Sequence, residues 1–96
     1  MAKGDICRFE VGYIVDVQSD LLSDLKTRVV VPLKPKSEFP QPADRLNPII
    51  QIGDKDWVLL PQFLATVAVS EIGEKVGEFE DSFALTNALG MVFHGI

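Results

Sequence analysis

Proline and glycine divide most of this 96-residue chain into segments that are short for helices. The sequence has six prolines and seven glycines, and four of the prolines fall between Lys34 and Pro48. Proline breaks helix interiors, and both residue types favour turns. By contrast, the stretch from Asp81 to His94 contains no proline and has helical apolar spacing. The pattern therefore predicts several short strands followed by one helix.

Runs of β-branched or alternating apolar residues predict about six strands. We expect them at Ile6–Val11, Tyr13–Gln18, Arg28–Leu33, Ile49–Ile52, Trp57–Leu60 and Thr66–Ile72. Tight turns at Gly12 and at Gly53–Asp56 would make hairpins of the first pair and of the fourth and fifth strands. The central run, Val29-Val30-Val31, suits a strand buried on both faces, with Pro32 marking its end or an edge position.

The segments between these strands are predicted to be irregular. Ser19–Thr27 is expected to be a loop or a single helical turn, and Gly73–Gly77 a turn-rich connection. Lys34–Pro48 is expected to be a surface excursion, with one short helical turn near Ala43–Leu46, because no longer helix tolerates its proline density.

The predicted helix carries its own start and stop signals. Asp81 or Ser82 can cap the first turn, and Gly95 suits the position just past the last one. The fold class is therefore mainly β, a small antiparallel barrel or packed sheets with a C-terminal helix over one open face. Residues 1–96 are expected to form a single domain.

Charge and composition limit the function classes. The net charge is −5 with a pI near 4.6, which disfavours direct binding to the phosphates of a nucleic acid and suits a basic protein partner. The single cysteine, Cys7, excludes an internal disulfide. No apolar run is long enough for a signal peptide core or a membrane span, so the protein is expected to be cytoplasmic with no membrane partner.

The sequence offers little material for catalysis or metal binding. His94 is the single histidine, and no nucleophile motif accompanies it. Asp16, Asp20 and Asp24 recur every four residues, but the first lies in an expected strand and no calcium-loop series is present. We therefore expect no cofactor, no metal and no enzymatic activity, which leaves protein–protein interaction as the favoured class.

The end of the chain predicts where such an interaction occurs. Helical apolar spacing runs through Leu89, Val92 and Phe93 into His94-Gly95-Ile96, with no polar tail behind it. Chain termini usually carry solvating residues. This apolar end is therefore expected to be either packed or presented to a partner, and we favour presentation to a larger protein.

Two blocks of the sequence resemble the CcdB family, the toxins of bacterial toxin–antitoxin modules that poison DNA gyrase. The first combines Asp16–Leu22 with Thr27–Leu33. The second combines Pro48–Asp54, Trp57, Val69–Glu74 and the ending Gly95-Ile96. Because the order and spacing of these blocks agree, the resemblance covers nearly the whole chain.

The resemblance implies an SH3-like antiparallel barrel with a C-terminal helix, a homodimer, and two protein partners. The dimer would enter the DNA gyrase A-subunit dimer and trap the gyrase–DNA cleavage complex without a catalytic centre of its own. A flexible CcdA-like antitoxin would neutralise it. Carried over by position, the gyrase-binding residues are Leu21, Leu22, Gly90, Phe93, His94, Gly95 and Ile96.

Two of those positions depart from the family pattern, which has Trp at His94 and Asn at Gly90. An alternative function is therefore a protein of the same fold that binds antitoxin and no longer poisons gyrase. A third is an endoribonuclease like the MazF toxins, although Arg8, Arg28 and Arg45 are far apart in sequence. For antitoxin binding, the expected residues lie in the excursion: Glu38, Phe39, Asp44, Arg45 and Leu46.

Overall fold

Seven strands and one helix make up the fold in the computed structural model, which describes residues 1–95. The strands are β1 (Asp5–Phe9), β2 (Gly12–Asp16), β3 (Thr27–Pro35), β4 (Ile49–Ile52), β5 (Lys55–Leu59), β6 (Ala65–Ala68) and β7 (Lys75–Glu78). The helix is α1 (Ser82–His94), and the one-turn 3-10 helices are η1 (Asp20–Leu22), η2 (Lys36–Glu38), η3 (Pro61–Phe63) and η4 (Val69–Glu71). This confirms the expected mainly β class with a C-terminal helix.

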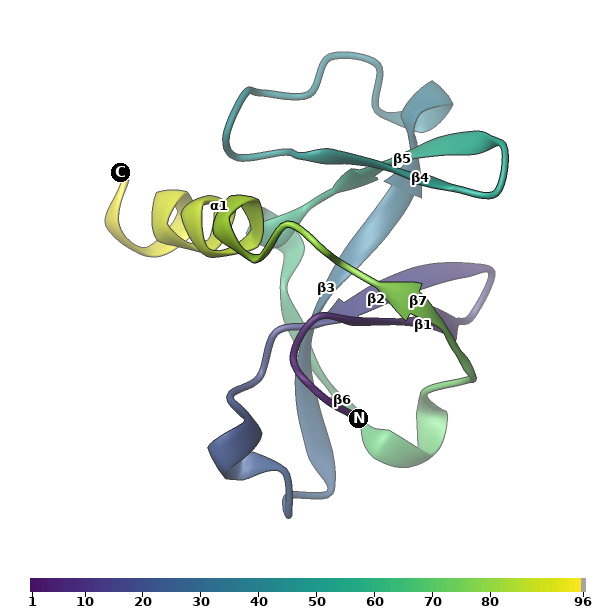
Figure 1. The fold of residues 1–96 in the computed structure, drawn as a ribbon, viewed down its shortest axis with the longest axis vertical. Coiled ribbons are helices and arrows are strands. Elements are labelled where there is room, and N and C mark those ends of the chain that lie inside the picture. Colours follow the sequence, from purple (N-terminus) through teal and green to yellow (C-terminus); the bar gives the residue numbers. More distant parts are fainter. Residues whose placement is uncertain (96) are drawn as a thin grey trace.

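The strands form one curled antiparallel sheet in the order β4-β5-β3-β2-β1-β7, with β6 also paired to β3. The nine-residue β3 is the centre, because β2 pairs along one side while β6 and β5 share the other. Figure 1 shows the sheet curling into a half-barrel with α1 beside it. The outermost strands, β4 and β7, leave the barrel open between them.

The core lies on both faces of the central strands, as the Val29-Val30-Val31 run predicted. Val31 packs in the larger cluster, to which α1 contributes Leu85 and Ala88. Val30 packs on the opposite face with Cys7 and Ile14. Neighbouring residues of a strand point to opposite faces, so a continuous apolar run fills both clusters.

Pro32 lies inside β3 and does not end it, which corrects the expectation for this residue. Toward β2, Pro32 occupies a position without ladder hydrogen bonds, opposite Ile14. Its other side lies where the partner of β3 changes from β6 to β5, and its carbonyl accepts the Leu60 N–H at 3.0 Å. The missing proline donor therefore costs no ladder bond.

The last two sheet segments differ from expectation. The strand predicted over Thr66–Ile72 ends at Ala68, because Val69–Glu71 turns into η4. The connection predicted over Gly73–Gly77 was also wrong, because β7 begins at Lys75 and pairs with β1 across a bulge. The four residues of β7 are mostly exposed, so backbone pairing with β1 holds this strand in place. Its sequence has no apolar alternation that would have predicted a strand.

The other irregular segments follow the sequence more closely. Ser19–Thr27 contains the single turn η1, and the excursion closes a helical turn where the Asn47 N–H donates to the Ala43 carbonyl at 2.9 Å. No helix among residues 1–95 is long and apolar enough to cross a membrane.

Candidate functional site

The η1 turn presents two adjacent leucines to solvent. Leu21 is 94% exposed and Leu22 49% exposed. Ser19 caps the turn, since its hydroxyl oxygen accepts the Leu21 N–H at 3.2 Å. Exposed large apolar side chains side by side on a capped turn suit a docking surface better than a solvated loop.

A buried polar network fixes that turn to the sheet. Gln18 donates from Nε2 to the Leu22 carbonyl at 2.9 Å and accepts the Val29 N–H at 3.1 Å. The Gln18 N–H in turn donates to Asp16 Oδ1 at 2.9 Å. The turn is therefore tied to β2 and β3, and the position of Leu22 depends on groups well inside the molecule.

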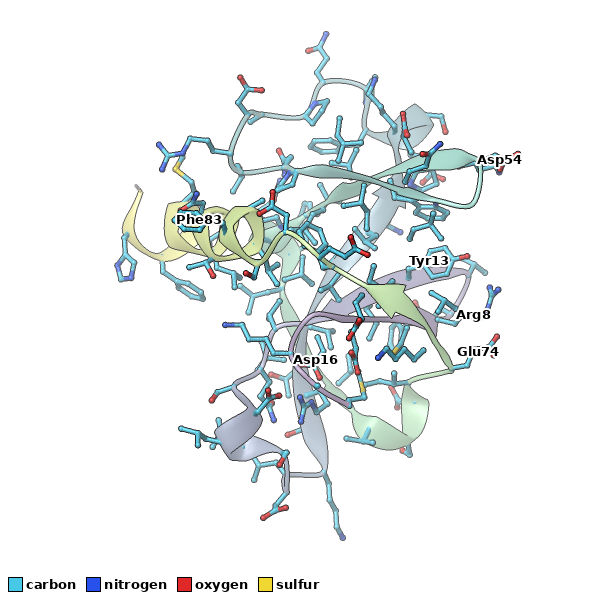
Figure 2. The ribbon with its side chains drawn as sticks, in the orientation of Figure 1. Arg8, Tyr13, Asp16, Asp54, Glu74 and Phe83 are labelled. Carbon is cyan, nitrogen blue, oxygen red and sulfur yellow. The ribbon has the colours of Figure 1, made fainter. Side chains whose placement is uncertain are left out.

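At the base of the network lies a buried ion pair. Arg28 Nε donates to Asp16 Oδ2 at 2.8 Å, and Arg28 Nη2 contacts the same oxygen. Arg28 is 2% exposed and Asp16 is fully buried; Figure 2 labels Asp16 just below the middle of the view. The spacing of the aspartates gave no sign of this pair, because the two partners become neighbours through strand pairing.

The end of α1 presents the second exposed group. Phe93 is 62% exposed, and His94 and Gly95 are exposed beside it. Gly95 closes the helix in a left-handed conformation with φ of 75°, and its N–H donates to the Gly90 and Met91 carbonyls. This glycine cap fixes the direction in which the chain leaves the helix. Below we call Phe93, His94 and Gly95 the helix end.

Asp81 starts the helix as expected, because its Oδ1 accepts the Ala84 N–H at 2.9 Å. The half-buried Gly90 lies on the last turns of α1, near the helix end. Ile96 lies outside the described residues. The structure thus gathers the helical members of the expected gyrase-binding set at one end of α1.

The remaining expected residues lie elsewhere. In Figure 1, η1 lies low on the side toward which the free end of α1 projects, and the excursion lies at the far end of the long axis. Glu38 ends η2, Phe39 follows it, and Asp44, Arg45 and Leu46 form the turn farther along the excursion. The expected antitoxin-binding residues therefore occupy a region separate from Leu21 and Leu22.

Sequence reasoning missed a groove at the open side of the half-barrel. Residues from β4, from β7 and from the start of α1 line a cavity of about 450 Å³. Below we call it the seam; its lining residues are Ile6, Pro48, Ile49, Ile50, Gln51, Glu78, Phe79, Glu80, Asp81 and Ala84. The strand β7, which no apolar pattern announced, forms one of its margins.

Two exposed cations of the sheet, Arg8 and Lys75, are paired with carboxylates. Arg8 bonds Glu74 at 2.9 Å and lies over the Tyr13 ring, an arrangement visible at the right of Figure 2. The hydrogen bond to Glu74 raises the pKa of Arg8. Lys75 lies 3.2 Å from Asp5, and this hydrogen bond raises the pKa of Lys75. These side chains are engaged in holding β1, β2 and β7 together.

The described residues contain neither a cluster of metal-ligating side chains nor an exposed cysteine. Within residues 1–95, no three His, Cys, Asp or Glu side chains are grouped closely enough to hold a metal ion. The buried Cys7 thiol has its pKa raised by burial and by the nearby carboxylates of Asp5 and Asp16, which disfavours the reactive thiolate.

Comparisons with known proteins agree with this geometry. The family model described as CcdB protein matches residues 3–95. A mycobacterial endoribonuclease solved in complex with its cognate antitoxin superimposes with a TM-score of 0.78 at 15% identity, over 96% of this chain and 93% of that one. The toxin MazF-mt6 of Mycobacterium tuberculosis gives 0.75 at 15% identity, over 95% of each chain. At such identities these structures show a shared fold.

Proposed function

Because the chain belongs to the CcdB family, whose members are toxins of bacterial toxin–antitoxin modules, we propose that it binds the DNA gyrase A subunit and traps the gyrase–DNA cleavage complex. The observation that carries this proposal is the exposure of Phe93 at a rigid helix end. A large aromatic side chain that is 62% exposed leaves apolar area for a partner to cover.

The mechanism is mechanical obstruction. Leu21, Leu22 and the helix end supply apolar contacts to the gyrase A subunit, and gyrase itself cuts the DNA. The toxin stabilises the state in which the DNA is cleaved, so resealing becomes slow. All the bond breaking belongs to gyrase, and the toxin contributes differential binding to one conformation of its target.

An antitoxin is the second partner. The family implies a flexible CcdA-like chain, and one of the solved proteins of the same fold was captured with its antitoxin. The net charge of −5 favours a basic antitoxin segment. We place its contacts on the excursion between Glu38 and Leu46, which lies away from Leu21 and Leu22 and leaves room for both partners.

A homodimer completes the proposal. Met1, Leu25 and Val69 are exposed apolar residues around a depression of about 600 Å³ that also borders Arg28. A second copy would cover this face, which we propose as the dimer contact. Light scattering should give twice the monomer mass at micromolar concentration, and Leu25→Asp should shift the protein to monomer.

The deciding experiment is a supercoiling and cleavage assay with purified gyrase. The proposal predicts that the protein increases linear DNA recovered after denaturation of the trapped complex. It also predicts growth arrest on induction in a bacterium, rescued by co-expression of a cognate antitoxin. Full gyrase activity at a large molar excess of the protein would overturn it.

One departure from the family pattern supports a second candidate function, antitoxin binding without gyrase poisoning. His94 stands where the family pattern has Trp, and the smaller ring offers less contact area at an exposed position. Loss of a hot-spot Trp typically costs about 2–4 kcal/mol, or roughly 30- to 1000-fold in affinity. If the protein binds antitoxin and leaves gyrase active, then His94→Trp should restore some trapping.

We propose that the protein is not itself a nuclease, although solved proteins of this fold are described as endoribonucleases. RNA cleavage needs a base, an acid and free positive charge at the phosphate. Arg28 is buried against Asp16, and Arg8 is bonded to Glu74. Incubation with labelled RNA should therefore give no cleavage, and metal-independent cutting would contradict the assignment.

A further inference from the structure

We propose that the seam between β4 and β7 binds an extended, basic peptide segment that adds a strand to the open edge of the half-barrel. The inference deepens the proposed function, because the antitoxin, besides the contacts that we place on the excursion, is the expected source of such a segment. It rests on that function only for the source of the peptide. The binding chemistry follows from the seam itself.

Among residues 1–95, no strand pairs with the outer edge of β4. Ile50 pairs with Trp57, and the Leu59 N–H donates to the Pro48 carbonyl at 2.9 Å. In an antiparallel ladder, residues alternate between facing the partner strand and facing away. Pro48, Ile50 and Ile52 therefore face β5, while Ile49 and Gln51 direct their N–H and C=O groups toward the seam. Unpaired edges of this kind are templates for another strand.

The β7 side of the seam also directs backbone N–H and C=O groups into it. The Phe79 N–H donates to the Gly4 carbonyl at 2.7 Å, so Phe79 faces β1, and Gly77 does so by alternation. Glu78 lies between them and directs its backbone groups away from β1, toward the seam. An inserted strand would therefore find donors and acceptors on β4 and on β7, which is the arrangement that β-strand addition uses.

The residues that line the seam determine which side chains the bound peptide needs. Ile6 and Phe79 are buried core residues that reach the groove, and Ala84 of α1 closes one end. A strand in the seam would direct alternate side chains onto this apolar floor and the others outward. Alternation of apolar and polar residues is thus the pattern that fits.

The charge of the seam determines that the polar residues of the bound peptide should be basic. Glu78, Glu80 and Asp81 line the seam, and its ten lining residues include no lysine or arginine. Asp81 caps α1 and Glu78 lies 3.4 Å from Lys75, whereas Glu80 is exposed. Carboxylates on one margin attract a cationic segment and disfavour an acidic one. The guest is therefore an alternating apolar and basic peptide.

Size supports a short guest. The cavity volume of about 450 Å³ lies within the usual range for ligand clefts. At about 3.3 Å per residue, the four residues of β4 span roughly 13 Å. A peptide of seven residues therefore covers the whole margin. In Figure 1 the chain from β7 into α1 passes below β4, and residues of both segments line the seam.

The test uses the purified protein and a fluorescein-labelled peptide, Lys-Val-Arg-Ile-Lys-Val-Arg, followed by fluorescence anisotropy. We expect saturable binding that weakens as salt is raised. The matched peptide with Glu at each basic position should bind at least 50-fold more weakly. Equal binding of the two peptides would overturn the proposal, as would absence of saturation by the basic one.

Backbone pairing is tested with two variants at one position. Gln51→Pro removes the N–H that faces the seam and no ladder bond to β5, and Gln51→Ala removes the same side chain but keeps the N–H. We expect about fivefold weaker binding for the proline variant relative to the alanine variant. Equal affinities would contradict strand addition.

A second measurement does not depend on how the proline variant folds. N-methylation of alternate peptide nitrogens, in either register, should weaken binding to the unaltered protein at least fivefold. The charge argument is tested by Glu80→Gln, expected to weaken binding about twofold to fivefold. Asp54→Asn, in the β4–β5 turn outside the seam, should have no effect. Unchanged binding after N-methylation, or after Glu80→Gln, would overturn the corresponding part of the proposal.

The outcome is distinguishable from failure of the gyrase proposal. Peptide binding without any effect on gyrase supports peptide binding in the seam and contradicts gyrase poisoning. Trapped gyrase cleavage complexes without peptide binding support gyrase poisoning and contradict peptide binding in the seam. If the peptide affinity falls as protein concentration drives dimerisation, the seam is a contact between two copies of this chain, and the peptide assignment is wrong.

Discussion

The helix end and the seam are proposed binding surfaces of two different kinds. At the helix end, exposed side chains carry the interaction, led by Phe93 on the last turn of a capped helix. In the seam, the backbone of Ile49, Gln51 and Glu78 carries it, over an apolar floor. The comparison predicts that the first surface is sensitive to changes of single side chains, whereas the second tolerates such changes and loses binding when its backbone donors are removed.

The largest expected effect concerns the buried ion pair beneath the η1 turn. Asp16→Asn should lower the free energy of unfolding by about 3–5 kcal/mol, because it leaves the buried Arg28 charge without its partner. Chemical denaturation would measure it. The control Asp24→Asn, exposed in the η1 loop, should change stability by less than about 0.5 kcal/mol. Equal stability of the two variants would contradict the structural role of the pair.

The next effect separates the two ends of α1. Phe93→Ala should weaken gyrase binding by about 30- to 1000-fold through lost apolar contact. Phe83→Ala provides a matched control, since Phe83 is 77% exposed on the first turn of the same helix. Surface plasmon resonance against the gyrase A subunit would compare them. Equal losses would show that the whole helix, and not its end, carries the contact.

A smaller effect tests how the helix end is shaped. Gly95→Ala should lower stability by about 1–2 kcal/mol, because the left-handed φ of 75° is strained for a residue with a Cβ atom. Gly77→Ala, at the seam margin, should be close to neutral, since a Cβ atom there meets nothing within 4 Å. Thermal unfolding of both variants checks the contrast. A larger loss of stability for Gly77→Ala than for Gly95→Ala would contradict this expectation.

The smallest effect concerns β1, the neighbour of β7. Burial raises the pKa of the Cys7 thiol, so the folded protein keeps this proton at a pH where the unfolded chain has lost it. The stability from Cys7 is therefore complete below about pH 8.5 and is lost as pH rises toward the folded pKa. Urea denaturation between pH 7 and 10 should show a steeper decline for the wild type than for Cys7→Ala. Parallel curves would contradict it.

How far the sequence predicts each surface follows from the same contrast. The helix end was predictable, because Asp81, Gly95 and the apolar spacing between them are side-chain signals. The seam was not, because β7 has no apolar alternation and its pairing with β1 is a backbone property. The Asp16–Arg28 pair was not predicted either, because strand pairing between β2 and β3 brings together residues that are twelve positions apart in the sequence.

The measurement that tests the central claim most directly is gyrase-dependent DNA cleavage with the intact protein and with a variant lacking His94–Ile96. We predict trapped cleavage complexes with the intact protein, and at least a 30-fold higher concentration requirement for the truncated one. Equal trapping by both proteins, or none by either, would contradict an account in which an apolar helix end holds gyrase in its cleaved state.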